Sequence, residues 1–142
     1  MIYVDITTRC PQRERVLDFA VRVIESFFTH RFQRDAFIDI TVGKIQDGYL
    51  GFCVGDKEQI DIDLSRRGVE DEMLSPKDIA RNLAHELVHA KQFIKGQIDG
   101  DMRYRKSTTA KWEDHTDTEY LDQPWEQEAY GLEEELVERF WK

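Results

Sequence analysis

The sequence predicts an α+β fold in which helices pack on a small twisted sheet. Strand-like and helix-like segments come in groups, in the order β-α-β-β-β-α-loop-α. Grouped elements favour an α+β layer fold over a doubly wound fold, in which strands and helices alternate. The 142 residues suit one domain, residues 1–142, and the contents of 40% hydrophobic and 11% aromatic residues exclude a disordered chain.

The first strand and helix are predicted from the spacing of apolar residues. Residues Ile2–Thr7 alternate apolar and polar side chains, which is typical of a half-buried strand. Pro11 suits a first helical position, and apolar residues then recur at helical spacing, so we expect an amphipathic helix over Pro11–Phe28. Its expected buried face consists of Val16, Ala20, Val23, Ile24 and Phe27.

Three short β-rich runs follow, and the turn residues Asp47-Gly48 and Gly55-Asp56 separate them. In chain order the runs are Phe37–Val42, Tyr49–Val54 and Gln59–Leu64. The third run alternates apolar residues with aspartates, so one of its faces meets water. We expect this run to be an edge strand, because such alternation protects an edge from promiscuous pairing.

A second helix is predicted between two clear end signals. Ser75 can cap its start, Pro76 fits its first turn, and Asp78 faces the positive helix end. Gly96 is a natural stop. The following segment, Gln97–Gln123, is long and polar, and a connection of this length is usually functional or mobile.

Pro124 opens the last predicted helix, whose apolar face would consist of Trp125, Ala129, Leu132, Leu136 and Phe140.

Composition narrows the possible partners and compartment. With 20 basic and 29 acidic residues the net charge is −9, which repels phosphate backbones, so we expect no nucleic-acid partner. No apolar run approaches the ~20 residues that span a bilayer, and Met1–Asp5 does not resemble a signal peptide. Cys10 and Cys53 are too few for a disulfide framework. We therefore expect a cytoplasmic protein without a membrane partner.

The sequence His85-Glu86-Leu87-Val88-His89 is an H-E-x-x-H motif inside the second predicted helix. Residues four apart lie one turn apart on the same helical face, so both imidazoles can reach one metal ion. Glu86 lies about 100° round the helix from His85, where it can approach a water on the ion without binding the ion. Neutral imidazoles suit Zn²⁺, so the motif predicts a zinc site.

The third ligand must come from elsewhere in the chain, and the candidates are His30, His115 and the acidic residues of the last helix. No histidine follows at the spacing of the metzincins. The run Trp125-Glu126-Gln127-Glu128-Ala129-Tyr130 begins a helix, so a carboxylate there can point at a neighbouring helix. Helical geometry leaves Glu126 and Glu128 open, since they flank the apolar stripe at similar angles.

From Ser75 to Phe140, these motifs resemble the gluzincins, whose third ligand is a glutamate on a helix after the H-E-x-x-H helix. The segment Pro-Trp-Glu-x-Glu-Ala is similar to that of small cytosolic or phage-encoded zinc metallopeptidases, and relatives in style are the ImmA/IrrE group and the CAAX proteases. The resemblance implies a minimal zincin-like fold and Glu126 as the third zinc ligand. Four residues after this glutamate, at a position where the family often has Asp or Asn, the chain has Tyr130.

The resemblance implies a peptidase that hydrolyses protein or peptide substrates through a zinc-activated water. Glu86 would act as general base and pass the proton to the leaving amine. A further donor is needed for the tetrahedral oxyanion. Tyr104, His115, Tyr120 and Tyr130 all follow the motif helix, and among them we favour His115 and Tyr120, on the long loop, as catalytic residues.

Two other functions fit the same motifs. One is a zincin-fold module that binds metal in a structural or regulatory role, for instance a phage component, and the other is a hydrolase of non-peptide amides. Retention of Glu86 favours the peptidase. In zincin-type enzymes the strand before the motif helix borders the cleft, so a peptide could dock on Gln59–Leu64 by strand addition. Asp61 and Asp63 would then favour basic or neutral substrates, while edge protection is the alternative reading.

Overall fold

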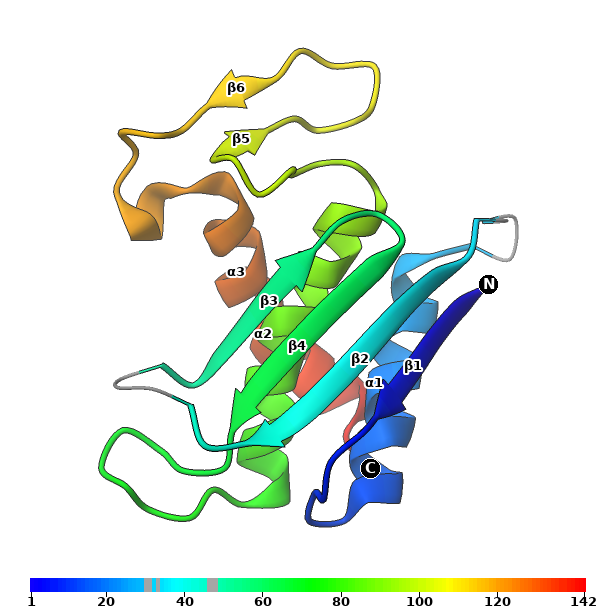
Figure 1. The fold of residues 1–142 in the computed structure, drawn as a ribbon, viewed down its shortest axis with the longest axis vertical. Helices are drawn as coiled ribbons and strands as arrows, with labels where there is room; N and C mark the ends of the chain where they lie inside the picture. The colour runs from blue at the N-terminus through cyan, green and yellow to red at the C-terminus, as the bar shows by residue number, and fades with distance from the viewer. Residues whose placement is uncertain (30–31, 33, 46–48) are drawn as a thin grey trace.

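The central sheet has the strand order β1-β2-β4-β3 (Figure 1). Strands β1, β2 and β4 run parallel, and β3 lies antiparallel to β4 at one edge. The strands are β1 (Ile2–Ile6), β2 (Ala36–Gly43), β3 (Gly51–Gly55) and β4 (Gln59–Ser65). This computed structural model describes residues 1–29, 32, 34–45 and 49–142. The candidate ligand His30 and the predicted turn Asp47-Gly48 lie outside the described residues.

Helices α1 (Arg13–Phe27), α2 (Pro76–Ile94) and α3 (Pro124–Phe140) lie behind the sheet in Figure 1. Helices α1 and α2 pack on this face of the sheet, and α3 packs on α2. The mixed sheet with its helices on one side agrees with the predicted α+β class. Because only one face is covered, the strands alternate between buried and exposed side chains. In β4 the buried residues are Ile60, Ile62 and Leu64, and the exposed residues are Gln59, Asp61 and Asp63.

The prediction that Gln59–Leu64 is an edge strand is wrong. This segment forms β4, which pairs with β2 on one side and β3 on the other. Its alternation records a sheet with one open face and carries no information about position within the sheet. The edge next to α2 is instead formed by β3, which begins two residues later and ends one residue later than the predicted run Tyr49–Val54.

Helix α1 begins at Arg13, two residues later than predicted. Gln12 has a left-handed backbone with φ 51°, so Pro11 lies in the turn before the helix. The buried face contains the predicted residues except Phe27, which is half-buried. Phe19 also lies on that face, and its ring packs edge-on against Trp141, with the ring centroids 5.9 Å apart.

Helix α2 has the predicted ends. The Ser75 hydroxyl accepts a hydrogen bond from the backbone N–H of Asp78 at 3.1 Å, and Pro76 is the first helical residue. Gly96 follows the helix with φ +71°, a backbone conformation that favours glycine.

The segment 97–123 is more ordered than its weak pattern indicated. It forms a small antiparallel pair, β5 (Arg103–Tyr104) with β6 (Glu113–Asp114), and a 3-10 helix at Tyr120–Asp122. A bond from the His115 backbone N–H to the Met102 carbonyl, 2.8 Å long, extends this pairing. In Figure 1 the hairpin lies beyond the carboxyl end of α2 and the start of α3.

Cys10 and Cys53 are both free cysteines in the structure. A search of the described residues found no helix with the length and apolar character needed to cross a membrane.

Candidate metal centre

Helix α2 presents both histidines of the motif on its face toward α3. Between them, Leu87 and Val88 are fully buried in the core and fix the rotation of the helix. The rings of His85 and His89 meet edge-on, with centroids 5.0 Å apart. Both side chains are largely shielded from water, with exposed fractions of 12% and 9%.

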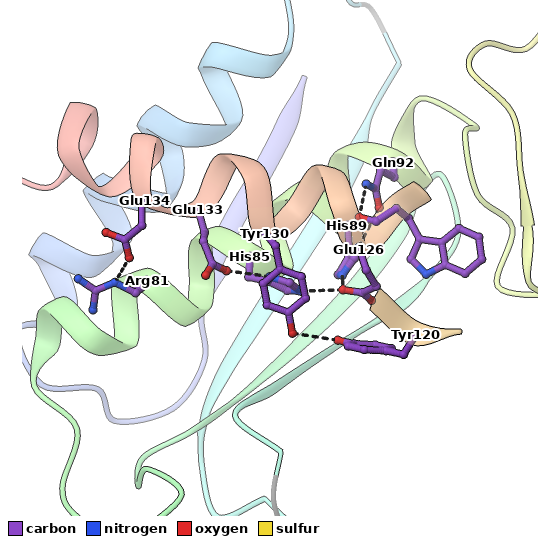
Figure 2. A network of polar contacts seen from close by, with 10 residues as sticks. Arg81, His85, His89, Gln92, Tyr120, Glu126, Tyr130, Glu133 and Glu134 are labelled. Atoms are coloured by element: carbon purple, nitrogen blue, oxygen red, sulfur yellow. Dashed lines mark hydrogen bonds and ion pairs between the residues drawn. The ribbon is translucent and has the colours of Figure 1, made fainter. Parts of the chain in front are cut away.

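Helix α3 brings the third group. Pro124 is its first residue, and Glu126 lies in its first turn, 7% exposed. Glu126 Oε1 lies 2.9 Å from His85 Nε2 and 3.1 Å from His89 Nε2 (Figure 2). One ligand atom from each of these three residues lies within 4.8 Å of the others, an arrangement that could hold a metal ion.

Glu128, the other candidate for third ligand, points elsewhere. Its carboxylate pairs with the buried ammonium group of Lys91 and accepts a hydrogen bond from Gln92 Nε2 at 3.0 Å. The structure therefore brings Glu126, and not Glu128, to the two imidazoles.

Each imidazole is oriented by a second partner that the sequence reasoning missed. Glu133 Oε2 lies 2.8 Å from His85 Nδ1, and Gln92 Oε1 lies 2.8 Å from His89 Nδ1 (Figure 2). Contacts of this kind hold the proton on Nδ1 and leave Nε2 to face a metal. A signal was present for both partners: Gln92 follows His89 by three residues, and Glu133 follows Glu126 by seven, which is two helical turns.

Without a metal, the two imidazoles and Glu126 stabilise each other's charged forms. Burial opposes the charge on His85, but hydrogen bonds to Glu126 and Glu133 outweigh it and raise the pKa of His85 to about 9. Burial and the Glu126 contact compete in the same way at His89, and the pKa of His89 is raised. Burial would raise the pKa of Glu126, but the two histidines lower it to about 2.

Glu86 lies beside this cluster and is itself 6% exposed. Burial raises the pKa of Glu86, although the nearby His89 and His85 act in the opposite direction. The residue lines a cleft of about 590 Å³ together with both histidines and Glu126. Strand β3 forms one wall, and a Cβ atom on Gly51 would lie 3.2 Å from Glu86 Cγ, so the strand passes close to this carboxyl group.

The two residues predicted as oxyanion donors differ in position. Tyr120 lines the cleft, and its hydroxyl lies 3.4 Å from that of Tyr130, whose ring packs edge-on against His85. His115 lies on the hairpin side, where its ring nitrogens contact Thr118 Oγ1 at 3.0 Å and Glu113 Oε1 at 3.2 Å. The structure does not bring His115 to the lining of the cleft.

Tyr104 also lies outside the cleft, next to His115, with ring centroids 6.5 Å apart. Cys53 is half-buried on β3 and lines the cleft.

Searches of protein-family models, curated proteins and solved structures returned no significant match to this chain.

Proposed function

We propose that this chain is a zinc-dependent peptidase with a zincin-like fold. The observation that carries the proposal is the convergence of His85, His89 and Glu126, whose ligand atoms lie within 4.8 Å of one another, beside the buried Glu86. Two imidazoles and one carboxylate are a ligand set of catalytic zinc sites, which keep a further position open. A cleft of about 590 Å³ leads to this cluster and gives a substrate access.

The chemistry of the donors fits zinc. Both imidazoles have their Nδ1 atoms occupied by Glu133 and Gln92, so their Nε2 atoms are the ones available to a metal. Nitrogen donors with a single carboxylate suit zinc better than magnesium or calcium, which prefer oxygen-only sites. When bound, zinc supplies a Lewis acid that polarises a carbonyl group and makes water acidic.

In the proposed reaction Glu86 is the general base. It takes a proton from the attacking water and passes it to the amine that leaves when the peptide C–N bond breaks. Tyr120 lines the same cleft and can donate its hydroxyl hydrogen to the oxyanion of the tetrahedral intermediate. Tyr130 contacts the Tyr120 hydroxyl and packs on His85, so it positions both.

Strand β3 favours a peptide over other amides as the substrate. The Ser65 N–H donates a hydrogen bond to the carbonyl of Leu50, directly before β3. In the register that follows, the even-numbered residues of β3 are the ones whose backbone groups bond to β4. By the alternation of an antiparallel ladder, the N–H and C=O groups of Gly51 and Cys53 point away from β4. Among the described residues no strand pairs with this outer edge, so an extended peptide can add there as a further strand.

The metal and the base are tested separately. We expect about one zinc per purified chain, with strong loss in His85→Ala and His89→Ala and a smaller loss in Glu126→Ala. The control Glu135→Ala removes an exposed carboxylate of the same helix and should retain the zinc fully. Glu86→Gln should keep its zinc and lower the cleavage of a proteome-derived peptide library by about a hundredfold or more. Metal content by mass spectrometry and peptide sequencing read the two outcomes.

A chelator-sensitive peptidase activity that Glu86→Gln leaves intact would contradict the proposed mechanism. A zinc-loaded wild-type chain that cleaves no peptide in the library would contradict the peptidase function. In that case, hydrolysis of small amides would identify an amide hydrolase, and its absence would support a structural or regulatory metal module.

A further inference from the structure

A second, smaller cavity of about 160 Å³ adjoins the metal centre on the side of the carboxyl end of α2. It shares His89 and Glu126 with the large cleft, and Cys53 of β3 lines both. The cluster therefore lies between two hollows that open on either side of it. The apolar residues that line the smaller cavity are Phe93, Ile98, Met102 and Trp125.

The far wall of this cavity belongs to the segment that follows α2, and several contacts hold it in place. Arg103 Nε donates to Asp99 Oδ2 at 2.7 Å, so this cationic side chain of the cavity lining is already paired. Met102 has φ +61°, a backbone conformation that is strained for a bulky residue, and its carbonyl accepts the His115 N–H at 2.8 Å. His115, which the sequence suggested as catalytic, thus supports this wall.

We propose that the cavity beside Phe93, Ile98, Met102 and Trp125 is the specificity pocket for the substrate residue that precedes the scissile bond, and that it selects leucine, methionine or phenylalanine. The inference rests on the proposed peptidase function. Its volume is close to that of a cavity of about 150 Å³ that holds a benzene ring, so one side chain of this size fills it. A charged side chain would lose its hydration there without gaining an unpaired partner.

The direction of the peptide follows from the direction of β3. Along β3 the chain passes from Gly51, in the large cleft, to Cys53, which borders the smaller cavity. A peptide that pairs antiparallel with β3, the slightly more stable mode, runs the opposite way, from the small cavity to the large cleft. The small cavity then receives a residue on the amino side of the scissile bond. The small cavity shares His89 and Glu126 with the cleft and so lies directly beside the cluster. The substrate residue that it receives is therefore the one directly before the scissile bond.

The test is the cleavage profile of zinc-loaded full-length protein on a proteome-derived peptide library. We expect leucine, methionine and phenylalanine to be enriched directly before the cleaved bond. Ile98→Trp fills the cavity and should lower kcat/KM for a leucine substrate, relative to its alanine analogue, by about tenfold or more. Met102→Gly enlarges the cavity and suits the positive φ, so it should fold and shift the preference toward tryptophan. Met73→Gly, in a loop away from both cavities, is the matched control and should leave the profile unchanged.

Each failure has its own signature. Cleavage without apolar enrichment before the bond, or enrichment that persists in both Ile98→Trp and Met102→Gly, overturns the pocket and leaves the peptidase function intact. Apolar enrichment directly after the bond that responds to these variants overturns the direction of binding. No cleavage by the zinc-loaded wild-type chain overturns the proposed function and, with it, this pocket.

Discussion

Removing the carboxylate of Glu133 should weaken zinc binding without removing any zinc ligand. Glu133 Oε2 lies 2.8 Å from His85 Nδ1 and holds the ring with Nε2 toward Glu126. Losing such a partner costs about 10- to 100-fold in metal affinity, or about 1.4 to 2.8 kcal/mol. We expect Glu133→Ala to fall in this range, and Glu133→Gln to lose less, because its amide oxygen can still accept the Nδ1 hydrogen. Competition with a chromophoric zinc chelator measures both dissociation constants.

The adjacent residue Glu134 provides the control. It has the same charge on the same helix, but it pairs with Arg81, at a distance from the metal centre along α2 (Figure 2). Glu134→Ala should therefore change the zinc dissociation constant by about twofold at most, since exposed pairs contribute little. Equal zinc affinities for Glu133→Ala and Glu134→Ala would refute the positioning role of Glu133.

Three further expectations concern the same fold. Zinc must displace a proton from His85, whose pKa the contacts with Glu126 and Glu133 raise to about 9. Zinc affinity should therefore rise about tenfold per pH unit between about pH 7 and about pH 9, as chelator competition at each pH would show, and a flat profile would contradict this expectation. Gly51→Val should lower peptide turnover about tenfold or more at unchanged zinc content, because a Cβ atom at this position would lie 3.2 Å from Glu86 Cγ and displace that side chain. An unchanged kcat would show that β3 can accommodate the larger side chain without moving Glu86. Asp61 lies opposite Asp39 on the open sheet face, so Asp61→Asn should stabilise the fold by about 0.2 to 1 kcal/mol in urea unfolding, and by less in high salt.

The ends of α2 were predictable because local chemistry decides them. A cap at Ser75, a proline at the next position and a glycine at Gly96 each act within one helical turn, and none depends on the rest of the fold. The i, i+4 spacing of His85 and His89 is equally local. The start of α1 was less certain, because a proline suits both a first helical turn and the turn before it.

The order of strands was not predictable from the same evidence. Alternation in Gln59–Leu64 reports that one face of the strand is exposed, and this holds at the centre of a one-sided sheet as well as at its edge. The edge strand β3 has small residues at Gly51 and Cys53 on its buried face, which leaves space for the cleft. That feature becomes informative only once the strand is known to lie beside α2.

The choice between Glu126 and Glu128 shows why the third ligand needed the tertiary structure. The two residues flank the apolar stripe of α3 symmetrically, so the helix could turn either carboxylate toward the histidines. Helix α3 runs antiparallel along α2, its buried apolar stripe sets its rotation, and an ion pair lies at each end of the contact. At one end Lys91 binds Glu128, and at the other Arg81 binds Glu134.

Both of these glutamates point away from the paired imidazoles, while Glu126 and Glu133 face His85 from either side. The position of α2 beside this stripe therefore decides which acidic residues of α3 can serve the metal. A motif search that looks only for carboxylates after H-E-x-x-H cannot make this distinction, because it carries no information on how α3 packs against α2.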